Sequence, residues 1–260
     1  MCAILASVDG VVTDPAQAHI PATDEGLLRG DGVFEVVRVY DGRPFAMDEH
    51  LQRMSRSAAN LRLEIDLSAL QADAEAVLAE AGPADGALRM LFTRGGRRIV
   101  LLEELKQLPA TLTLALITYS PTRIMDGVKS LSYAPNMLAT RLATERGCDD
   151  ALLVTPHGRV LEAPTCSFFY ALGGEQLFTP PLDDHILDSI TRRHVLAVTG
   201  AQERVTTSDD LGSISEAFLA STLREVHPVA RIEERELQAP GPLSRAAAEA
   251  VAQRIRAALR

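Results

Sequence analysis

Lysine is the scarcest candidate nucleophile in this chain. Only Lys106 and Lys129 are present, beside 24 arginines. Lys106 lies next to Glu103 and Glu104 in LEELKQLP, a setting that keeps an ammonium group charged and hydrated, so we expect it at the surface. Lys129 lies between apolar neighbours in GVKSLSY, where partial burial would favour the neutral amine and permit Schiff-base chemistry. A lysine at a strand edge with its ammonium group in water would explain Lys129 equally well.

A single carboxylate, Glu162, lies in VLEAPTCSFF, where its neighbours are apolar or small. A buried carboxylate needs a cationic partner, because burying an unpaired charge is costly. A protonated ring nitrogen of a cofactor would be such a partner. An exposed strand residue that follows the turn at His157-Gly158 would need none, so the local sequence leaves both interpretations open.

A possible anion site lies at a predicted helix start in DDHILDSITRRHV. Ser189, Ile190 and Thr191 stand where free backbone N–H groups, hydroxyls and the helix dipole together favour a phosphate group. Ordinary N-capping by Asp188 or Ser189 would produce the same pattern.

The composition excludes several classes of protein. The chain has 260 residues, 47% of them hydrophobic, which is enough for a sizeable core and excludes a disordered chain. A formal net charge of −9 and the lack of an Arg-rich block argue against nucleic-acid and membrane partners, which need a positive surface. The first residues, MCAILASVDG, show no basic leader before a short apolar run, so we expect a cytosolic protein.

The cysteines and histidines show no spacing typical of disulfides or metal sites. Cys2, Cys148 and Cys166 are odd in number and far apart, so we expect three reduced thiols. The six histidines form no HxH, HxxH or HExxH pair, and we expect no metal. Neither a GxxxxGK[ST] loop nor a GxGxxG motif is present, which removes the commonest signals for nucleotide binding.

The elements that must position these residues begin with strands. Residues 1–45 are rich in β-formers, and GVFEVVRVYDGRPF predicts a hairpin around the turn signal Asp41-Gly42. Apolar residues then recur at helical spacing from Asp48, and a second helix is predicted over 67–81, ending at Gly82-Pro83. Two further strands are predicted in ALRMLFTRGG and ATLTLALITYS.

The second half continues as a mixture of helices and strands. We expect a helix over 136–146 stopped by Gly147, the strands ALLVT and RVLEA around the turn 156–158, and a hairpin formed by SFFYAL and QLFTP. A helix in ILDSITRRHVLAV, the strand EAFLAS and an amphipathic helix in SRAAAEAVAQRIRAALR complete the chain.

This order predicts an α+β fold of two domains. Because strands and helices do not alternate strictly, antiparallel or mixed sheets with flanking helices are favoured over a Rossmann sheet or a barrel. We place the boundary at a linker over 120–127 that contains Pro121. It separates a small N-terminal domain, 1–119, from a larger C-terminal domain, 128–260, that carries Lys129.

Six ordered segments together resemble a known family. They are GDGVFEVVRVYDG, HLQRM, VKSLSY, VLEAPTCSFF, LFTPPLDDHILDSITRR and FLASTLREVHPV, and they run from about Gly30 to Val229. The order resembles the fold-type IV enzymes that use pyridoxal 5′-phosphate (PLP), the class IV aminotransferase family. That family includes branched-chain and D-amino-acid aminotransferases, (R)-selective amine transaminases and aminodeoxychorismate lyase. The resemblance covers most of the chain.

The resemblance implies roles for the matching residues. Lys129 would form the internal aldimine with PLP and later move the substrate proton. Glu162 would face the pyridine nitrogen and keep it protonated, so that the ring can accept electrons. Arg53 of HLQRM would bind the phosphate in a two-pronged ion pair. The remaining implied cofactor contacts are Tyr133 near the phenolic oxygen and Ile190, Thr191 and Thr222 at the phosphate.

Two segments depart from the family pattern. Where many members have E-G-x-x-x-N, this chain has Glu-Ala-Pro-Thr-Cys-Ser over 162–167, so the local cofactor contacts are expected to differ. Where I-L-x-G-I-T is common, Ser189 replaces the glycine. Serine adopts positive φ less readily than glycine, so an altered phosphate turn is expected, although its backbone donors remain.

The substrate side favours an aminotransferase over a lyase. Arg38 in FEVVRVYDG and Thr222 with Glu225-Val226 resemble the branched-chain group. Arg94 and Arg97 lie where several members place a carboxylate-binding loop, and a solvated basic turn would explain them equally well.

The resemblance implies a PLP-dependent transaminase that moves an amino group between an amino acid or amine and a 2-oxo acid in a ping-pong cycle. The alternatives are an aminodeoxychorismate lyase, which would yield 4-aminobenzoate and pyruvate, and an inactive PLP-binding protein. The resemblance also implies a homodimer with the active site at the domain interface.

Overall fold

The computed structural model describes residues 3–260, which form two compact units. Unit 1 comprises the described residues up to Gln107 together with Gly127–Tyr133 and Ala258–Arg260, and unit 2 comprises Leu108–Asp126 and Ala134–Ala257. The predicted division into 1–119 and 128–260 differs from these units in three places. Residues 108–119 group with unit 2, whereas the segment that carries Lys129 and the last three residues group with unit 1. The fold is α+β, as predicted.

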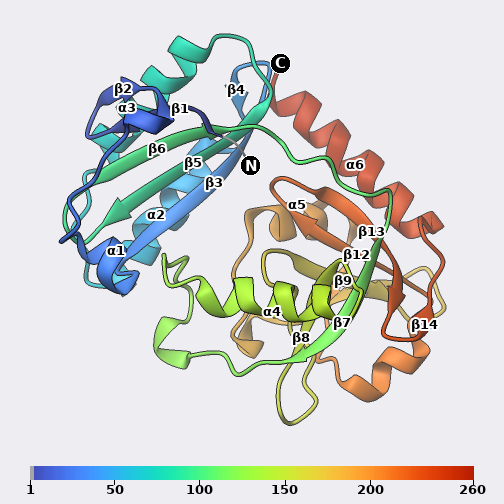
Figure 1. The fold of residues 1–260 in the computed structure, drawn as a ribbon. Helices are drawn as coiled ribbons and strands as arrows, with labels where there is room; N and C mark the ends of the chain where they lie inside the picture. The colour runs from blue at the N-terminus through green and yellow to red at the C-terminus, as the bar shows by residue number, and fades with distance from the viewer. Residues whose placement is uncertain (1–2) are drawn as a thin grey trace. The chain divides into compact units, whose positions relative to one another are not determined.

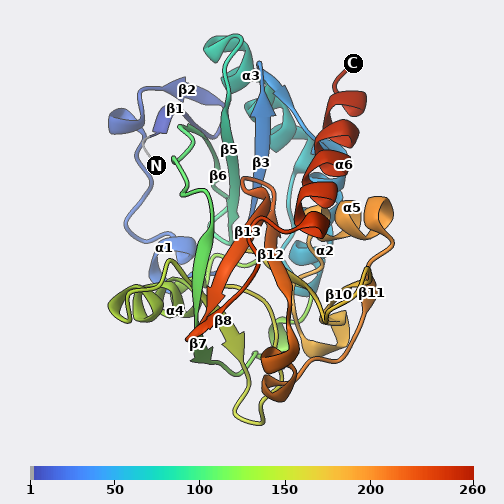
Figure 2. The same ribbon diagram turned by 90° about the vertical axis from the view of Figure 1, so that its right-hand side faces the viewer.

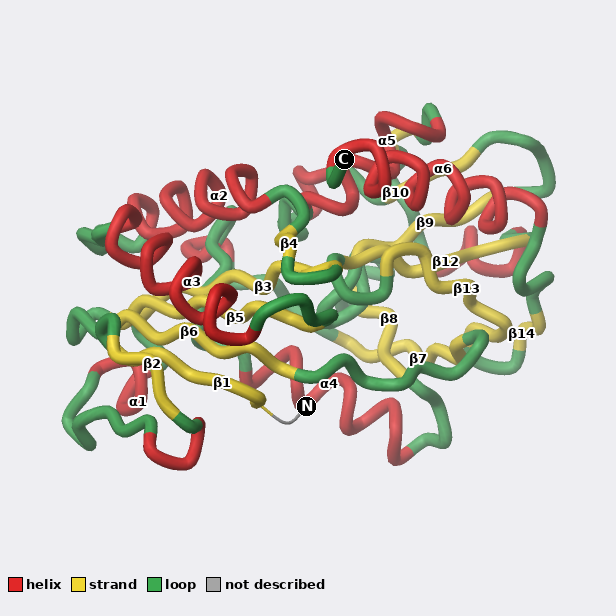
Figure 3. Tube along the Cα trace, turned by 90° about the horizontal axis from the view of Figure 1, so that it is seen from above, coloured by secondary structure: helices red, strands yellow, loops and turns green. Residues whose placement is uncertain are grey.

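Unit 1 is built on a six-stranded antiparallel sheet with the order β2-β1-β6-β5-β3-β4 (Figure 1). The strands are β1 (Ala3–Val8), β2 (Val11–Thr13), β3 (Gly32–Tyr40), β4 (Arg43–Pro44), β5 (Gly86–Thr93) and β6 (Arg98–Glu103). The long helices are α2 (Met47–Asn60) and α3 (Leu67–Ala81), and the short ones are η1 (Pro15–Gln17) and α1 (Glu25–Arg29). Figure 3 shows α2 and α3 together over one face of this sheet.

Alternation along β3 determines which of its residues face the helices. Val33, Val37 and Val39 are fully buried in one core cluster with Met54 of α2 and Leu70 of α3. Because successive strand residues point to opposite faces, the intervening side chains lie on the face away from α2 and α3. The strand therefore presents two chemically different surfaces, one to the helical core and one to the opposite side.

The segment around Lys129 extends this sheet at the free edge of β3. Val33 and Ser130 form an antiparallel bridge, the Phe34 N–H donates to the Lys129 carbonyl (3.1 Å), and the Leu131 N–H donates to the Gly32 carbonyl (3.0 Å). These main-chain bonds explain why the segment belongs to unit 1 although it follows residues of unit 2 in the chain.

Unit 2 contains an eight-stranded mixed sheet with the order β11-β10-β9-β12-β13-β7-β8 and with β14 paired to β13 (Figure 2). The β13–β7, β7–β8 and β10–β11 pairs are parallel and the others antiparallel. The strands are β7 (Leu112–Thr118), β8 (Asp150–Val154), β9 (Ser167–Ala171), β10 (Leu177–Thr179), β11 (Gln202–Glu203), β12 (Glu216–Ser221), β13 (Glu225–Ile232) and β14 (Arg235–Glu236). The helices are η2 (Arg123–Met125), α4 (Ala134–Glu145), η3 (Leu182–Asp184), α5 (Ile190–Thr199), η4 (Ser208–Ser213) and α6 (Pro242–Ala258).

Two strands of unit 2, β8 and β9, are buried on both faces. Every residue of β8 and β9 is buried, and the Phe169 and Phe218 rings stack with centroids 5.1 Å apart. On one face, Ala139 and Ala143 of α4 pack with Leu153 of β8. Full burial of these strands matches their continuous apolar sequences, which differ from the alternating pattern of β3.

Most predicted elements are present in the structure. The helix predicted over 67–81 has those bounds, and the one predicted over 136–146 spans Ala134–Glu145. The strand prediction for RVLEA is wrong, because Arg159 and Val160 make only isolated bridges before a tight turn joins Ala163 to Cys166.

The sequence does not predict the central strand β13, since it contains Pro228, which cannot donate a main-chain hydrogen bond.

Two of the three cysteines lie within the described residues. Cys148 and Cys166 are buried free thiols, which confirms that part of the cysteine prediction, whereas Cys2 lies outside the described residues.

No helix within residues 3–260 is both long enough and apolar enough to cross a bilayer.

Candidate functional site

The Lys129 side chain lies against two aromatic rings in unit 1. Its Nζ is 4.3 Å from the centroid of the Phe34 ring and 5.5 Å from that of Tyr133. The two rings meet edge to face, with centroids 5.1 Å apart and an interplanar angle of 84°. The face of an aromatic ring attracts a cation. Two rings packed edge to face also limit the directions in which the amine can move. The predicted reactive amine is thus positioned by contacts with two aromatic rings.

The backbone of Lys129 is held on two sides. Besides the bond from Phe34, the Lys129 N–H donates to the Ser57 hydroxyl of α2 at 3.1 Å, and Ser57 is fully buried. The strand pairing places Lys129 and Phe34 on one face of the sheet and Ser130 and Val33 on the other. Lys106, in contrast, is exposed, as the sequence predicted.

A buried charge cluster lies on the helical face of β3. Glu35 is fully buried, and its carboxylate accepts from Arg53 Nε (2.7 Å) and Nη2 (2.6 Å) and lies 2.8 Å from His50 Nδ1. Burial by itself would raise the pKa of Glu35, but the charge and hydrogen bonds of Arg53, supported by His50, lower the pKa to about 2. Burial lowers the pKa of His50, and the nearby positive charges of Arg53 and Lys129 act in the same direction.

Arg53, the predicted phosphate ligand, is thus buried in a two-pronged ion pair with Glu35. The pair holds the guanidinium in one orientation, which suits a positioned anion ligand but also offsets part of its charge. Sequence reasoning missed Glu35 and His50. The signal was a single acid in the apolar run GVFEVVRV, the same signal that drew attention to Glu162.

Glu162 lies in unit 2 in a loop between β8 and β9. Its Oε1 accepts a hydrogen bond from the Leu187 N–H at 2.9 Å, and its carbonyl accepts from the Leu153 N–H at 3.0 Å. The side chain is half-buried. The pKa of Tyr119 is raised by burial and by the negative charge of Glu162, which places this phenol in the electrostatic environment of the carboxylate. The structure therefore joins Glu162 to the predicted phosphate-binding loop over 186–191.

That loop ends in the capped start of α5. Ser189 is the N-cap residue, with φ −72° and ψ 134°, and its hydroxyl accepts from the Arg192 N–H at 3.3 Å. Ile190 and Thr191 are buried in the first turn, whose N–H groups have no acceptors within a helix. Because the backbone at Ser189 is extended, no positive φ is required there, and the serine is compatible with an anion-binding helix start.

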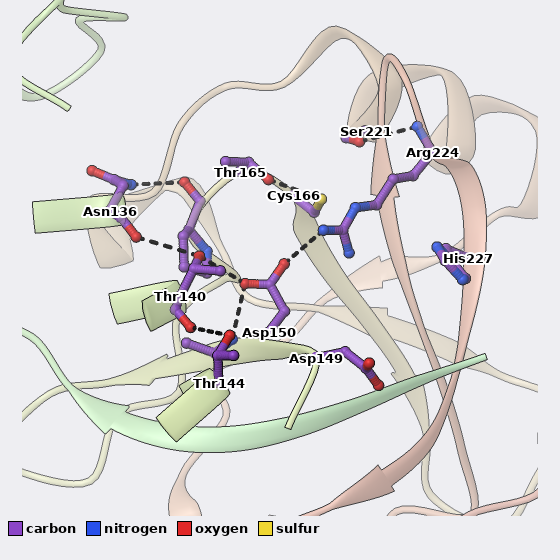
Figure 4. A network of polar contacts seen from close by, with 12 residues as sticks. Asn136, Thr140, Thr144, Asp149, Asp150, Thr165, Cys166, Ser221, Arg224 and His227 are labelled. Atoms are coloured by element: carbon purple, nitrogen blue, oxygen red, sulfur yellow. Dashed lines mark hydrogen bonds and ion pairs between the residues drawn. The ribbon is translucent and has the colours of Figure 1, made fainter. Parts of the chain in front are cut away.

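Thr222 lies in the three-residue turn between β12 and β13. It is half-buried, and the turn is followed by Glu225, which has a positive φ of 54°. Arg224 of the same turn reaches Asp150 at the start of β8, as Figure 4 shows.

The three arginines predicted on the substrate side are each engaged by an acid of their own unit. Arg38 lies 3.4 Å from Asp85, and Arg97 pairs with Asp9. Arg94 Nε donates to Asp31 at 2.5 Å, while its Nη atoms donate to the carbonyls of Leu61 and Arg62. Their roles toward a substrate carboxylate stay predictions.

Comparison with known proteins gives the family. The profile of the amino-transferase class IV family matches residues 32–232. A D-alanine aminotransferase of Bacillus licheniformis is 30% identical over 269 residues, covering 91% of this chain and 92% of that protein. A bifunctional aminodeoxychorismate lyase / D-amino acid transaminase of Mycobacterium tuberculosis is 32% identical over 228 residues, covering 76% and 79%.

A solved structure shares the fold. The structure of a hypothetical aminotransferase from Mycobacterium tuberculosis in its PLP-bound form has a TM-score of 0.87 and 26% identity, covering 97% of this chain and 99% of that one. Together with the family match over most of the chain, this similarity confirms the resemblance inferred from the six segments: the protein belongs to the class IV aminotransferase family.

Proposed function

We propose that this protein is a PLP-dependent transaminase that uses Lys129 as its reactive amine. The observation that carries the proposal is the placement of Lys129. It is one of only two lysines, its backbone is bonded to β3 and to α2, and its Nζ lies 4.3 Å from the Phe34 ring. The other lysine is exposed and lies among acidic residues.

The donor groups of the chain suit the aldehyde, the pyridine nitrogen and the phosphate of PLP. An amine is available for the aldehyde in Lys129, a carboxylate for the pyridine nitrogen in Glu162, and a helix start with hydroxyls for the phosphate at Ile190 and Thr191. Arg53 would add a positive charge for the phosphate and Tyr133 a phenol beside the amine. When bound, PLP supplies an electron-accepting ring that stabilises the carbanion left after a Cα–H bond breaks.

The residues of the chain would then divide the remaining work. Lys129 would hold the cofactor covalently through its Nζ. After the substrate amine has displaced it, Nζ would take the proton from the substrate Cα and deliver it to the cofactor carbon that is bonded to the substrate nitrogen. Glu162 would keep the ring nitrogen protonated through its negative charge. The Leu187 N–H orients that carboxylate at 2.9 Å, which keeps one oxygen in a defined direction.

The amine assignment is tested with the only two lysines of the chain. Lys129→Ala should abolish both transamination and the visible absorption band of lysine-bound PLP. Lys106→Ala is the matched control and should leave both unchanged, because its side chain is exposed. Activity that survives in Lys129→Ala would overturn the assignment.

The reaction class is tested with single amino donors in the absence of any acceptor. L-leucine, L-glutamate, D-alanine and an (R)-arylethylamine are added separately to the PLP-loaded protein. A transaminase should release one equivalent of carbonyl product from the donor that it accepts, and that donor reports the stereochemical preference.

A second candidate function is aminodeoxychorismate lyase, which the bifunctional relative favours. Pyruvate formed from aminodeoxychorismate, with no response to any amino donor, would support the lyase and contradict the transaminase. The homodimeric state and the cytosolic location stay predictions.

A further inference from the structure

The turn that carries Thr222 is tied to a different part of unit 2 by a partly buried ion pair. Arg224 Nη2 donates to Asp150 Oδ2 at 2.8 Å, with the Arg224 side chain 18% exposed and that of Asp150 2% exposed. Figure 4 shows the Arg224 side chain extending from the β12–β13 turn to the start of β8. A charged pair with so little solvent contact has few alternative arrangements.

Asp150 is itself held in place by two other donors. Its Oδ1 accepts from the Thr140 hydroxyl of α4 at 3.0 Å and from the Ala151 N–H at 2.9 Å. Three donors from three elements therefore orient one carboxylate, and Arg224 is the donor that comes from the turn. The carboxylate acts as a rigid anchor because its position depends on α4 and β8, which pack against each other.

The backbone next to this turn adopts a strained conformation that a fixed contact can stabilise. Ser221 pairs with Glu225 across the hairpin, and Glu225 has φ 54°, a left-handed conformation that costs a non-glycine residue free energy. The Arg224 N–H donates to the Ser221 hydroxyl at 3.3 Å within the turn. A strained conformation persists when its surroundings determine it strongly, and the Asp150–Arg224 pair lies directly beside the strained residue.

We propose that Arg224 and Asp150 are positioning residues that hold residues 222–224 in the shape with which Thr222 binds the phosphate of the cofactor. This inference rests on the proposed function, because it assumes that PLP binds to Lys129. Arg224 acts through the turn and does not itself contact the reacting atoms.

The test compares two ligands that differ only in the phosphate group. Full-length protein freed of cofactor is titrated with PLP and, separately, with pyridoxal, and binding is followed by the absorption band of the lysine-bound ligand. Arg224→Ala and the milder Asp150→Asn should weaken PLP binding by roughly tenfold, as expected for losing one well-placed charged hydrogen bond, and leave pyridoxal binding unchanged. Arg224→Lys should restore part of the lost affinity.

Two controls separate positioning from general destabilisation. Arg146→Ala removes another ion pair of unit 2, with Glu233, and should not change the ratio of PLP affinity to pyridoxal affinity. In a Thr222→Ala background, Arg224→Ala should have little further effect, because both changes remove the same phosphate contact.

The outcomes distinguish this inference from the proposed function. Equal weakening of both ligands, or no weakening of either, would overturn the positioning role. If the unsubstituted protein forms no lysine-bound band with PLP, the proposed function itself fails. Should Arg224→Ala not fold, Asp150→Asn decides the question, since it keeps the shape of the side chain and removes only its charge.

Discussion

The charge of the Glu35 carboxylate is strongly stabilised by its surroundings. It is fully buried, yet Arg53 and His50 hold its pKa at about 2. Removing one partner of a buried ion pair leaves the other charge without compensation, which costs about 3–5 kcal/mol. The cluster supports α2 through Arg53 and His50, and α2 also supplies the hydroxyl that holds the backbone of Lys129.

We expect Glu35→Gln to lower the free energy of unfolding at pH 7 by about 3 kcal/mol. Because the folded pKa of Glu35 lies below its unfolded value of 4.5, its stabilising effect is complete above pH 4.5 and is lost as the pH falls toward 2. The difference between wild type and variant in urea unfolding should therefore shrink over that range. Glu75→Gln, at an exposed carboxylate, is the control, and a gap that stays constant with pH would contradict the assignment.

Glu162→Gln tests the pyridine-nitrogen role. The amide can still accept a hydrogen bond from Leu187 but cannot hold a proton on the ring, so PLP should remain bound while Cα–H cleavage slows. Deuterium at the substrate Cα should then produce a larger isotope effect on turnover. An unchanged rate of Cα–H cleavage would rule out the role.

At the scale of elements, the C-terminal end of helix α3 depends on the backbone conformation of one glycine. Helix α3 ends at Gly82, with φ 68° and ψ −158°, a region that residues with a side chain rarely adopt. An added Cβ at Gly82 meets nothing within 4 Å, so a substitution there would test the backbone conformation alone.

We expect Gly82→Ala to lower the free energy of unfolding by about 1–3 kcal/mol, entirely through backbone strain. Gly174 also has open space around its added Cβ but does not have a positive φ, so Gly174→Ala should be nearly neutral. Thermal unfolding of both variants measures the difference. Equal effects at the two positions would show that strain does not explain the glycine at 82.

At the scale of the whole molecule, the family resemblance predicts a homodimer. Light scattering coupled to size-exclusion chromatography should give twice the 28.0 kDa mass of one chain. A mass of 28.0 kDa that persists at micromolar concentration would contradict the prediction.

The assignment of residues 127–133 to a unit could not be predicted from the sequence. Residues 127–133 follow a stretch that belongs to unit 2, and hydrophobic spacing along the chain assigns them to the second half. The main-chain bonds from Phe34 and Leu131 assign them instead to the sheet of unit 1. The two paired segments are about 95 residues apart in the chain. They pair because one edge of β3 is available to a further strand, which the composition of either segment does not reveal.

The sequence by itself determined the family, the α+β class and the bounds of α3, and it made Lys129 the candidate amine, because the order of motifs, helical periodicity and the scarcity of lysine can all be read along the chain. Only the tertiary structure decided that Phe34 packs against that amine, that Arg53 and His50 both bond to Glu35, and that Asp150 pairs with Arg224 of the turn. In each of these contacts the two partners come from different elements of the fold. Their partners follow from strand pairing and helix packing, which no single segment specifies.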